Sequence, residues 1–224
     1  LHSTSRRQRQ MCIRDRYDTE RLDNFLYEVF AAGVMDVSIK TRIGRDSSVE
    51  FEDIIDIYKK YPVSELIIHP RVQTDFYKNT PNMEVFAEGV AAYGRTDTVC
   101  YNGDINSVAD YERFIGNYPD IMKVMIGRGM IADPCLAERI KSTATGRAYD
   151  WNRFFTFHDE LYNNYCESDV GRGNTMFKMK ELWAYWSRLF YDVEGAERAL
   201  KKIRKTRDNG EYEAAVRVLA ALCR

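Results

Sequence analysis

Four short apolar runs alternate with longer amphipathic stretches across residues 17–150. The runs cover residues 37–42, 66–71, 99–104 and 124–129; each starts with Val or Leu and ends in polar or glycine residues. They begin roughly 30 residues apart, which is about the length of one βα unit. This alternation predicts a parallel sheet with helices outside it. The spacing is typical of a (β/α)₈ barrel, in which functional groups gather at the carboxyl ends of the strands.

The stretches between the runs carry apolar residues at helical spacing. In this first region we expect helices over residues 22–30, 49–61, 83–93, 107–118 and 134–143. From about residue 149 the pattern is helical only, with helices expected over residues 151–165, 175–191, 193–207 and 212–223. The apolar stripe that includes Trp183 and Trp186 is interpreted as the core of a helix bundle.

Residues 1–16 differ from the rest, with five arginines, one aspartate and no apolar period. A basic nucleic-acid-binding arm is one interpretation; we favour a non-native leader and exclude it from the fold prediction. The barrel pattern then starts in a helix, so we expect the chain to lack the first half of its barrel. The predicted division is a leader (1–16), half a barrel (17–148) and an all-α domain (149–224).

Composition narrows the class of protein. Hydrophobic residues make up 45% of the chain and charged residues 30%, as in a packed globular protein, and no segment has the character of a membrane span. The five cysteines lack CxxC spacing, which disfavours a metal site and favours a reducing cytoplasm. Residues 17–150 carry 15 basic and 22 acidic side chains, whereas residues 151–224 carry 13 and 11. The basic excess of the tail suits an RNA partner.

Three polar side chains stand at the ends of the first two predicted strands. Lys40 follows apolar neighbours, so it needs an anionic or electron-rich partner. That partner is either a ligand or a core acid such as Asp104. His69 and Arg71 lie two residues apart and should face the same side. A lone histidine would suggest a hydrogen-bonded core residue, but beside Lys40 and Asn102 a ligand contact is favoured.

The last two predicted strands end in glycine-containing turns. Asn102-Gly103-Asp104 follows the third strand and Gly127-Arg128-Gly129 follows the fourth. Glycines let backbone N–H groups approach a phosphate, and an arginine adds positive charge. The Gly-Arg-Gly sequence alone would fit an ordinary βα turn. Two such loops late in a barrel are a recurring phosphate-binding place.

The helical tail carries a run of cations without an intervening acid. These residues are Arg198, Lys201, Lys202, Arg204, Lys205 and Arg207. They could contact RNA phosphates, or they could be a solvated helix end that offsets the helix dipole. Lys178 and Lys180 are weaker candidates for an RNA contact.

At these motifs the sequence resembles the tRNA-dihydrouridine synthase family. The matching elements are residues 37–44, His69-Pro70-Arg71, residues 102–105 and residues 125–129, in the family's order and spacing. The resemblance implies a partial TIM barrel, corresponding to strands five to eight, followed by a helical domain that grips tRNA. It also implies an enzyme, a monomer when full length, that reduces uridine in tRNA with FMN as cofactor and NADPH or NADH as reductant.

The resemblance also implies roles for individual residues. Lys40 and His69 would contact the flavin, while Asn102, Gly103, Asp104, Gly127 and Arg128 would hold its ribityl phosphate. Arg71 would face the substrate uracil or the backbone, and Lys201, Lys202 and Lys205 would contact tRNA.

The family's catalytic acid is a cysteine in a Gly-Cys-Pro type loop after the fourth barrel strand, and this sequence has no such loop. We therefore expect this chain alone to be inactive. Cys100 and Cys135 do not match that position and are interpreted as small buried residues. Two alternatives stay open: another FMN-dependent barrel oxidoreductase, such as a dihydroorotate dehydrogenase-like enzyme, and a non-enzymatic RNA-binding remnant.

Overall fold

The computed structural model describes residues 18–33, 35–75, 79–142, 149–168 and 172–223. The predicted leader over residues 1–16 lies outside them. Contacts divide the chain into two compact units: Leu1–Asp104 with Glu112–Ile126, and Ile105–Tyr111 with Gly127–Arg224.

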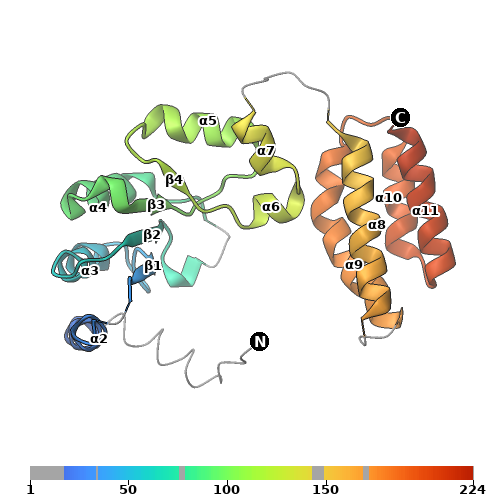
Figure 1. Cartoon of the computed structure of the whole chain (residues 1–224). Coiled ribbons are helices and arrows are strands. Elements are labelled where there is room, and N and C mark those ends of the chain that lie inside the picture. The colour runs from blue at the N-terminus through green and yellow to red at the C-terminus, as the bar shows by residue number, and fades with distance from the viewer. Residues whose placement is uncertain (1–17, 34, 76–78, 143–148, 169–171, 224) are drawn as a thin grey trace. The chain divides into compact units, whose positions relative to one another are not determined.

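The first unit is built on four parallel strands in the order β1-β2-β3-β4, and Figure 1 shows α2, α3 and α4 along one side of this sheet. The strands are β1 (Ser38–Arg42), β2 (Glu65–His69), β3 (Val99–Tyr101) and β4 (Lys123–Val124). The accompanying helices are α2 (Thr19–Ala31), α3 (Glu50–Tyr58) and α4 (Met83–Tyr93), with short turns η1 (Gln73–Asp75) and η2 (Thr96–Thr98). Helix α5 (Val108–Asn117) belongs to this unit from residue 112 onward. The predicted parallel α/β arrangement is confirmed.

Alternation along the strands gives the sheet two different faces. On the face that packs against helices, Leu66 and Ile68 have no exposed surface. Tyr101 continues this face, with its ring 5.2 Å from Phe86 of α4 and 4.0 Å from Phe114 of α5, measured between ring centroids. The packing leaves the alternate positions of each strand on the opposite face.

Several helices in both units begin or end at residues that are typical helix caps. The side chains of Asp18, Asn82, Asp150 and Asp208 each accept a hydrogen bond from the backbone N–H three residues later, which is the usual N-cap interaction. At the other end of α4, Gly94 has a positive φ of 74°, a conformation in which glycine is favoured. These signals explain why the predicted helix over residues 83–93 coincides with α4.

The second unit is helical. Its elements are α6 (Arg128–Ala132), α7 (Leu136–Lys141), α8 (Trp151–Glu167), α9 (Arg172–Trp186), η3 (Ser187–Phe190), α10 (Ala196–Lys205) and α11 (Asn209–Leu222). Figure 1 shows α8 to α11 side by side, and the expected bundle core is confirmed because Met179, Trp183 and Trp186 are at most 1% exposed. The Trp186 indole N–H donates to the Ile131 carbonyl at 2.9 Å.

Two local expectations were wrong. The fourth strand is limited to Lys123–Val124, and the Gly-Arg-Gly turn is instead the start of α6, with Gly127 as its N-cap residue. In addition, α6 and α7 belong to the second unit, although the predicted division placed them before residue 149. That division into functional domains stays a prediction.

A hydrogen-bonded chain crosses the core of the bundle. The Trp183 indole N–H donates to the Tyr212 hydroxyl at 2.8 Å. The same hydroxyl lies 2.7 Å from Nε2 of His158, whose Nδ1 is 2.8 Å from an Asp159 carboxylate oxygen. Because the carboxylate only accepts, Nδ1 carries the proton and Nε2 accepts from Tyr212. Burial lowers the pKa of His158, which keeps the ring neutral.

Candidate functional site

The carboxyl ends of the strands bring together side chains on the sheet face opposite to Leu66, Ile68 and Tyr101. Lys40 is aligned with Ile67 and Arg42 with His69. Because side chains alternate along a strand, all four belong to this face. Lys40 is exposed. His69 is 6% exposed.

His69 links β2 to the turn after β3. Its Nδ1 lies within hydrogen-bond distance of the Asn102 carbonyl oxygen, and a carbonyl can only accept, so Nδ1 carries the proton. The Asn102 side-chain amide donates to the Met125 carbonyl at 2.7 Å. His69 therefore has the hydrogen bond expected of a core histidine. It also lies on the same sheet face as Lys40, where the sequence analysis predicted a ligand contact.

The electrostatic setting of His69 is cationic. Burial is the main factor that lowers its pKa to about 4, and the positive charges of Arg42, Lys40 and Arg71 add to the effect. The ring is therefore neutral near pH 7, with Nε2 as its acceptor atom. Arg42 was missed in the sequence, although its place two residues after Lys40 on one strand could have revealed it.

Gly103 is required by a close approach of a neighbouring aromatic ring. A Cβ atom at this position would lie 1.9 Å from the Tyr101 hydroxyl oxygen. Burial raises the pKa of Tyr101 to about 12, so the hydroxyl stays protonated. The structure thus gives Gly103 a packing role beside the phosphate role expected from the sequence, which stays a prediction.

Arg71 and Asp104 form a buried ion pair. The Arg71 side chain is 1% exposed, whereas that of Asp104 is 33% exposed. The two terminal guanidinium nitrogens donate to the two carboxylate oxygens at 3.0 and 2.5 Å. Arg71 is thus a partner of Asp104, and the alternative in which Lys40 pairs with Asp104 stays a prediction.

In the second unit, Gly127 and Arg128 stand at the beginning of α6. Among the described residues, no side chain or distant backbone atom lies within 4 Å of the place that a Cβ of Gly127 would take. The backbone there is open to a ligand, in contrast to Gly103. The roles of Gly127 and Arg128 toward a phosphate stay predictions.

The cations of α10 form a stripe on its solvent side. Arg198, Lys201, Lys202 and Lys205 are exposed, while the opposite stripe of the helix is buried against the bundle. None of the ion pairs found among the described residues involves this cationic stripe. The weaker candidates are occupied: Lys180 donates to the Thr206 carbonyl, and Lys178 lies over the Tyr165 ring at 4.8 Å.

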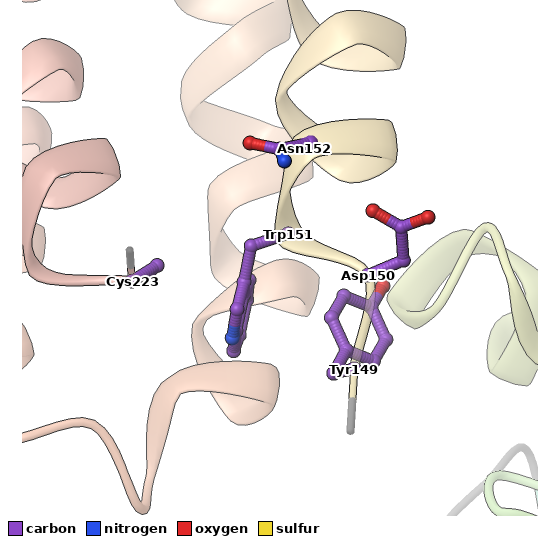
Figure 2. Close-up of a pocket in the computed structure, with 5 residues that line it drawn as sticks. All are labelled: Tyr149, Asp150, Trp151, Asn152 and Cys223. Carbon is purple, nitrogen blue, oxygen red and sulfur yellow. The ribbon is translucent and has the colours of Figure 1, made fainter. Parts of the chain in front are cut away.

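A cavity of about 540 Å³ lies at the start of α8, far along the chain from the strand ends (Figure 2). It is lined by Tyr149, Asp150, Trp151, Asn152 and Cys223. Asp150 caps α8, and burial raises the pKa of the Cys223 thiol. The lining therefore offers neither a cation nor a reactive thiolate for chemistry.

Burial makes Cys100 and Cys135 poor acids. Cys100 lies 4% exposed within β3, and burial raises its pKa to about 11. Burial also raises the pKa of Cys135. Among the described residues, no group of three or more potential metal ligands is present, and none of the described helices is long and apolar enough to cross a membrane.

Comparison with known proteins gives a family for this arrangement. The sequence model of the family described as "Dihydrouridine synthase (Dus)" matches residues 17–219. The tRNA-dihydrouridine(16) synthase of Shewanella oneidensis is 29% identical over 187 residues, which cover 82% of this chain and 54% of that protein.

A tRNA-dihydrouridine(16) synthase of Cupriavidus necator is 31% identical over 116 residues, covering 51% of this chain and 34% of that protein. The chain therefore aligns with about a third to a half of the length of these relatives. Because the family match extends from the first strand-bearing unit through the helical bundle, the chain belongs to the dihydrouridine synthase family.

Proposed function

We propose that the complete protein carrying this sequence is an FMN-dependent tRNA-dihydrouridine synthase that reduces uridine 16 of tRNA with NADPH or NADH. The observation that carries the proposal is the family match over residues 17–219. Both named relatives are tRNA-dihydrouridine(16) synthases, which supports position 16. We further propose that β1 to β4 are strands five to eight of a TIM barrel, and that residues 149–224 form the tRNA-binding domain.

The donor chemistry at the strand ends fits a flavin. An exposed lysine, a neutral histidine and an asparagine stand on one sheet face or in the turn that continues it, with Arg42 adding positive charge. Lys40 and His69 would hold the flavin ring, while the 102–104 turn would hold the phosphate. Bound FMN would supply the hydride that reduces the C5–C6 double bond of uracil.

The residues of this chain contribute charge and orientation. The ammonium group of Lys40 would stabilise negative charge that develops on the flavin edge. His69 would present Nε2 as an acceptor at neutral pH, because Nδ1 donates to Asn102. The hydrogen bond from Asn102 to Met125 would keep the turn after β3 fixed against the next strand. The acid that protonates uracil is assigned to no residue of this sequence.

The stripe on α10 is the proposed contact with tRNA. Four cations along one side of a helix can follow a phosphate backbone, and each phosphate contact adds to the salt dependence of binding. The alternative role, offsetting the dipole of α10, would need only the last turn of the helix. Arg198 and Lys201 lie outside that turn, which favours the RNA contact.

The activity is tested with the complete purified protein, a nicotinamide donor and a tRNA transcript. We expect dihydrouridine at position 16, measured by mass spectrometry of nuclease fragments, and no product with a transcript that has cytidine there. Product at another uridine would contradict the proposed modification of position 16. Absence of both flavin binding and product would contradict the proposed enzymatic activity.

The tRNA contact is tested by the triple substitution of Lys201, Lys202 and Lys205 to Gln. If the three lysines meet phosphates, the slope of log K against log salt should fall by about 2–3. Lys59→Gln, which removes an exposed lysine of α3's C-terminal end, should leave the slope unchanged. Equal slopes for the triple variant and the wild type would remove α10 from the interface.

A further inference from the structure

The guanidinium group of Arg71 is buried, and three of its five N–H groups donate to the protein. Besides the two bonds to Asp104 at 3.0 and 2.5 Å, its Nε–H donates to the Asn79 carbonyl at 2.5 Å. With 1% of the side chain exposed, little surface is left for a substrate. A paired, planar fork of this kind fixes the geometry of both partners.

The bonds of Arg71 connect the loops that follow three neighbouring strands. Its carbonyl accepts from the Ile43 N–H at 3.4 Å, in the loop after β1. Asn79 belongs to the loop after β2, and Asp104 to the turn after β3. Of the proposed flavin site, Lys40 lies on β1 and His69 on β2, while Asn102 lies in the turn after β3. Arg71 is therefore placed to set the spacing of that site without touching a ligand.

The chemistry of Asp104 supports the same conclusion. An ionised carboxylate has no hydrogen to donate, so it cannot bond to a phosphate dianion, and its negative charge would repel one. Pairing with the Arg71 guanidinium offsets this charge locally. The pair thus allows the 102–104 turn to approach an anion, although the turn contains an acid.

We propose that Arg71 is a positioning residue of the flavin site, which acts by offsetting the charge of Asp104 and fixing the 102–104 turn, and that it does not contact the uracil. This inference rests on the proposed function, because it concerns the same site. It assigns Asp104 to the support of the turn instead of direct phosphate binding. It also replaces the substrate contact that the sequence suggested for Arg71.

The test compares Arg71→Lys, Asp104→Asn and the double variant in the complete protein. Affinity for FMN is measured by quenching of flavin fluorescence on titration of the apoprotein, and the KM for tRNA is measured at saturating FMN. Lysine keeps the charge but loses the fork, so we expect FMN to bind about ten- to a hundredfold more weakly. We expect Asp104→Asn to weaken FMN binding by a similar factor. The double variant should bind FMN no more weakly than the single variant with the lower FMN affinity. In all three variants the KM for tRNA should change less than about twofold.

Arg95→Lys is the matched control. Arg95 also donates from its guanidinium to backbone carbonyls, those of Tyr58 and Tyr61 at 3.2 and 2.9 Å, but it precedes β3 and so lies at the opposite end of the strands. We expect this variant to lose stability in urea while it keeps FMN affinity. If Asp104→Asn does not fold, the FMN affinities of Arg71→Lys and Arg95→Lys still test whether Arg71 positions the flavin site.

Two results would overturn the proposal. The first is wild-type FMN affinity of Arg71→Lys together with a raised KM for tRNA, which would make Arg71 a substrate contact. The second is additive loss of FMN affinity in the double variant, which would show that the two residues act independently. Failure of the wild-type protein to bind FMN would instead refute the proposed function.

Discussion

Removing one hydroxyl group from the bundle core should destabilise the second unit strongly. In Tyr212→Phe, the Trp183 indole N–H loses its acceptor and Nε2 of His158 loses its donor, and the Tyr212 side chain has no exposed surface through which water could enter directly. A buried polar group left without a partner costs about 1–3 kcal/mol. Two such groups are left unpaired here, and the variant no longer has to bury the hydroxyl group, which offsets part of the cost. We therefore expect the free energy of unfolding to fall by about 2–4 kcal/mol.

Tyr162→Phe is the matched control. The Tyr162 hydroxyl donates to the Glu213 carboxylate at 3.0 Å, and Glu213 is exposed, so water can replace the lost bond. We expect this variant to lose less than about 1 kcal/mol. The two substitutions remove the same atom from neighbouring positions in the bundle, so their difference isolates the effect of the buried network.

Urea unfolding followed by tryptophan fluorescence is suited to the measurement. All three tryptophans of this sequence, Trp151, Trp183 and Trp186, belong to the second unit, so in this chain the signal reports the bundle. With a slope of about 1–3 kcal/mol/M, Tyr212→Phe should lower the midpoint by about 1–2 M. A loss for Tyr212→Phe no larger than that for Tyr162→Phe would refute the assigned network.

Two further predictions concern the first unit. The pKa of His69 is about 4 in the folded protein and about 6.5 in the unfolded chain, so the unfolded state binds the proton more tightly. Protonation of His69 should therefore lower the free energy of unfolding by about 2 kcal/mol between pH 7 and pH 5. Urea midpoints at both pH values should show this loss in the wild type, and an equal loss in His69→Gln would contradict it. Gly103→Ala should cost about 1–3 kcal/mol because its Cβ would meet Tyr101 at 1.9 Å. In contrast, Gly116→Ala on exposed α5 has open space and should be neutral or stabilising in the same unfolding measurement.

The sequence predicted those features that depend on local pattern. The short apolar runs, their regular spacing and the helical stretches between them were sufficient to predict four parallel strands. The sequence also set His69 beside Lys40, and in the strand register both lie on one face of the sheet. Helix ends were predictable where a capping side chain and a glycine marked them, as in α4.

Other features depend on contacts between residues distant in sequence. Glycines 127 and 129 disfavour a helix by intrinsic propensity, yet α6 begins at Arg128, and the Ile131 carbonyl in that helix accepts from Trp186, 55 residues later. Tertiary packing here outweighs local preference. Likewise, Asp104 pairs with an arginine 33 residues earlier, and no local pattern distinguishes this partner from Lys40.

The distribution of charge at the strand ends depends on that pairing. If Asp104 were a separate negative charge, it would offset Lys40 and make the site poorly suited to an anion. With Asp104 paired to Arg71, the positive charges of Lys40 and Arg42 act around a histidine that is kept neutral mainly by burial, with their field adding to the effect. The strand ends of an otherwise acidic region are thus locally cationic. A site of this kind suits a ligand that carries a phosphate and gains negative charge on reduction, and it follows from one buried ion pair that the sequence motif alone does not reveal.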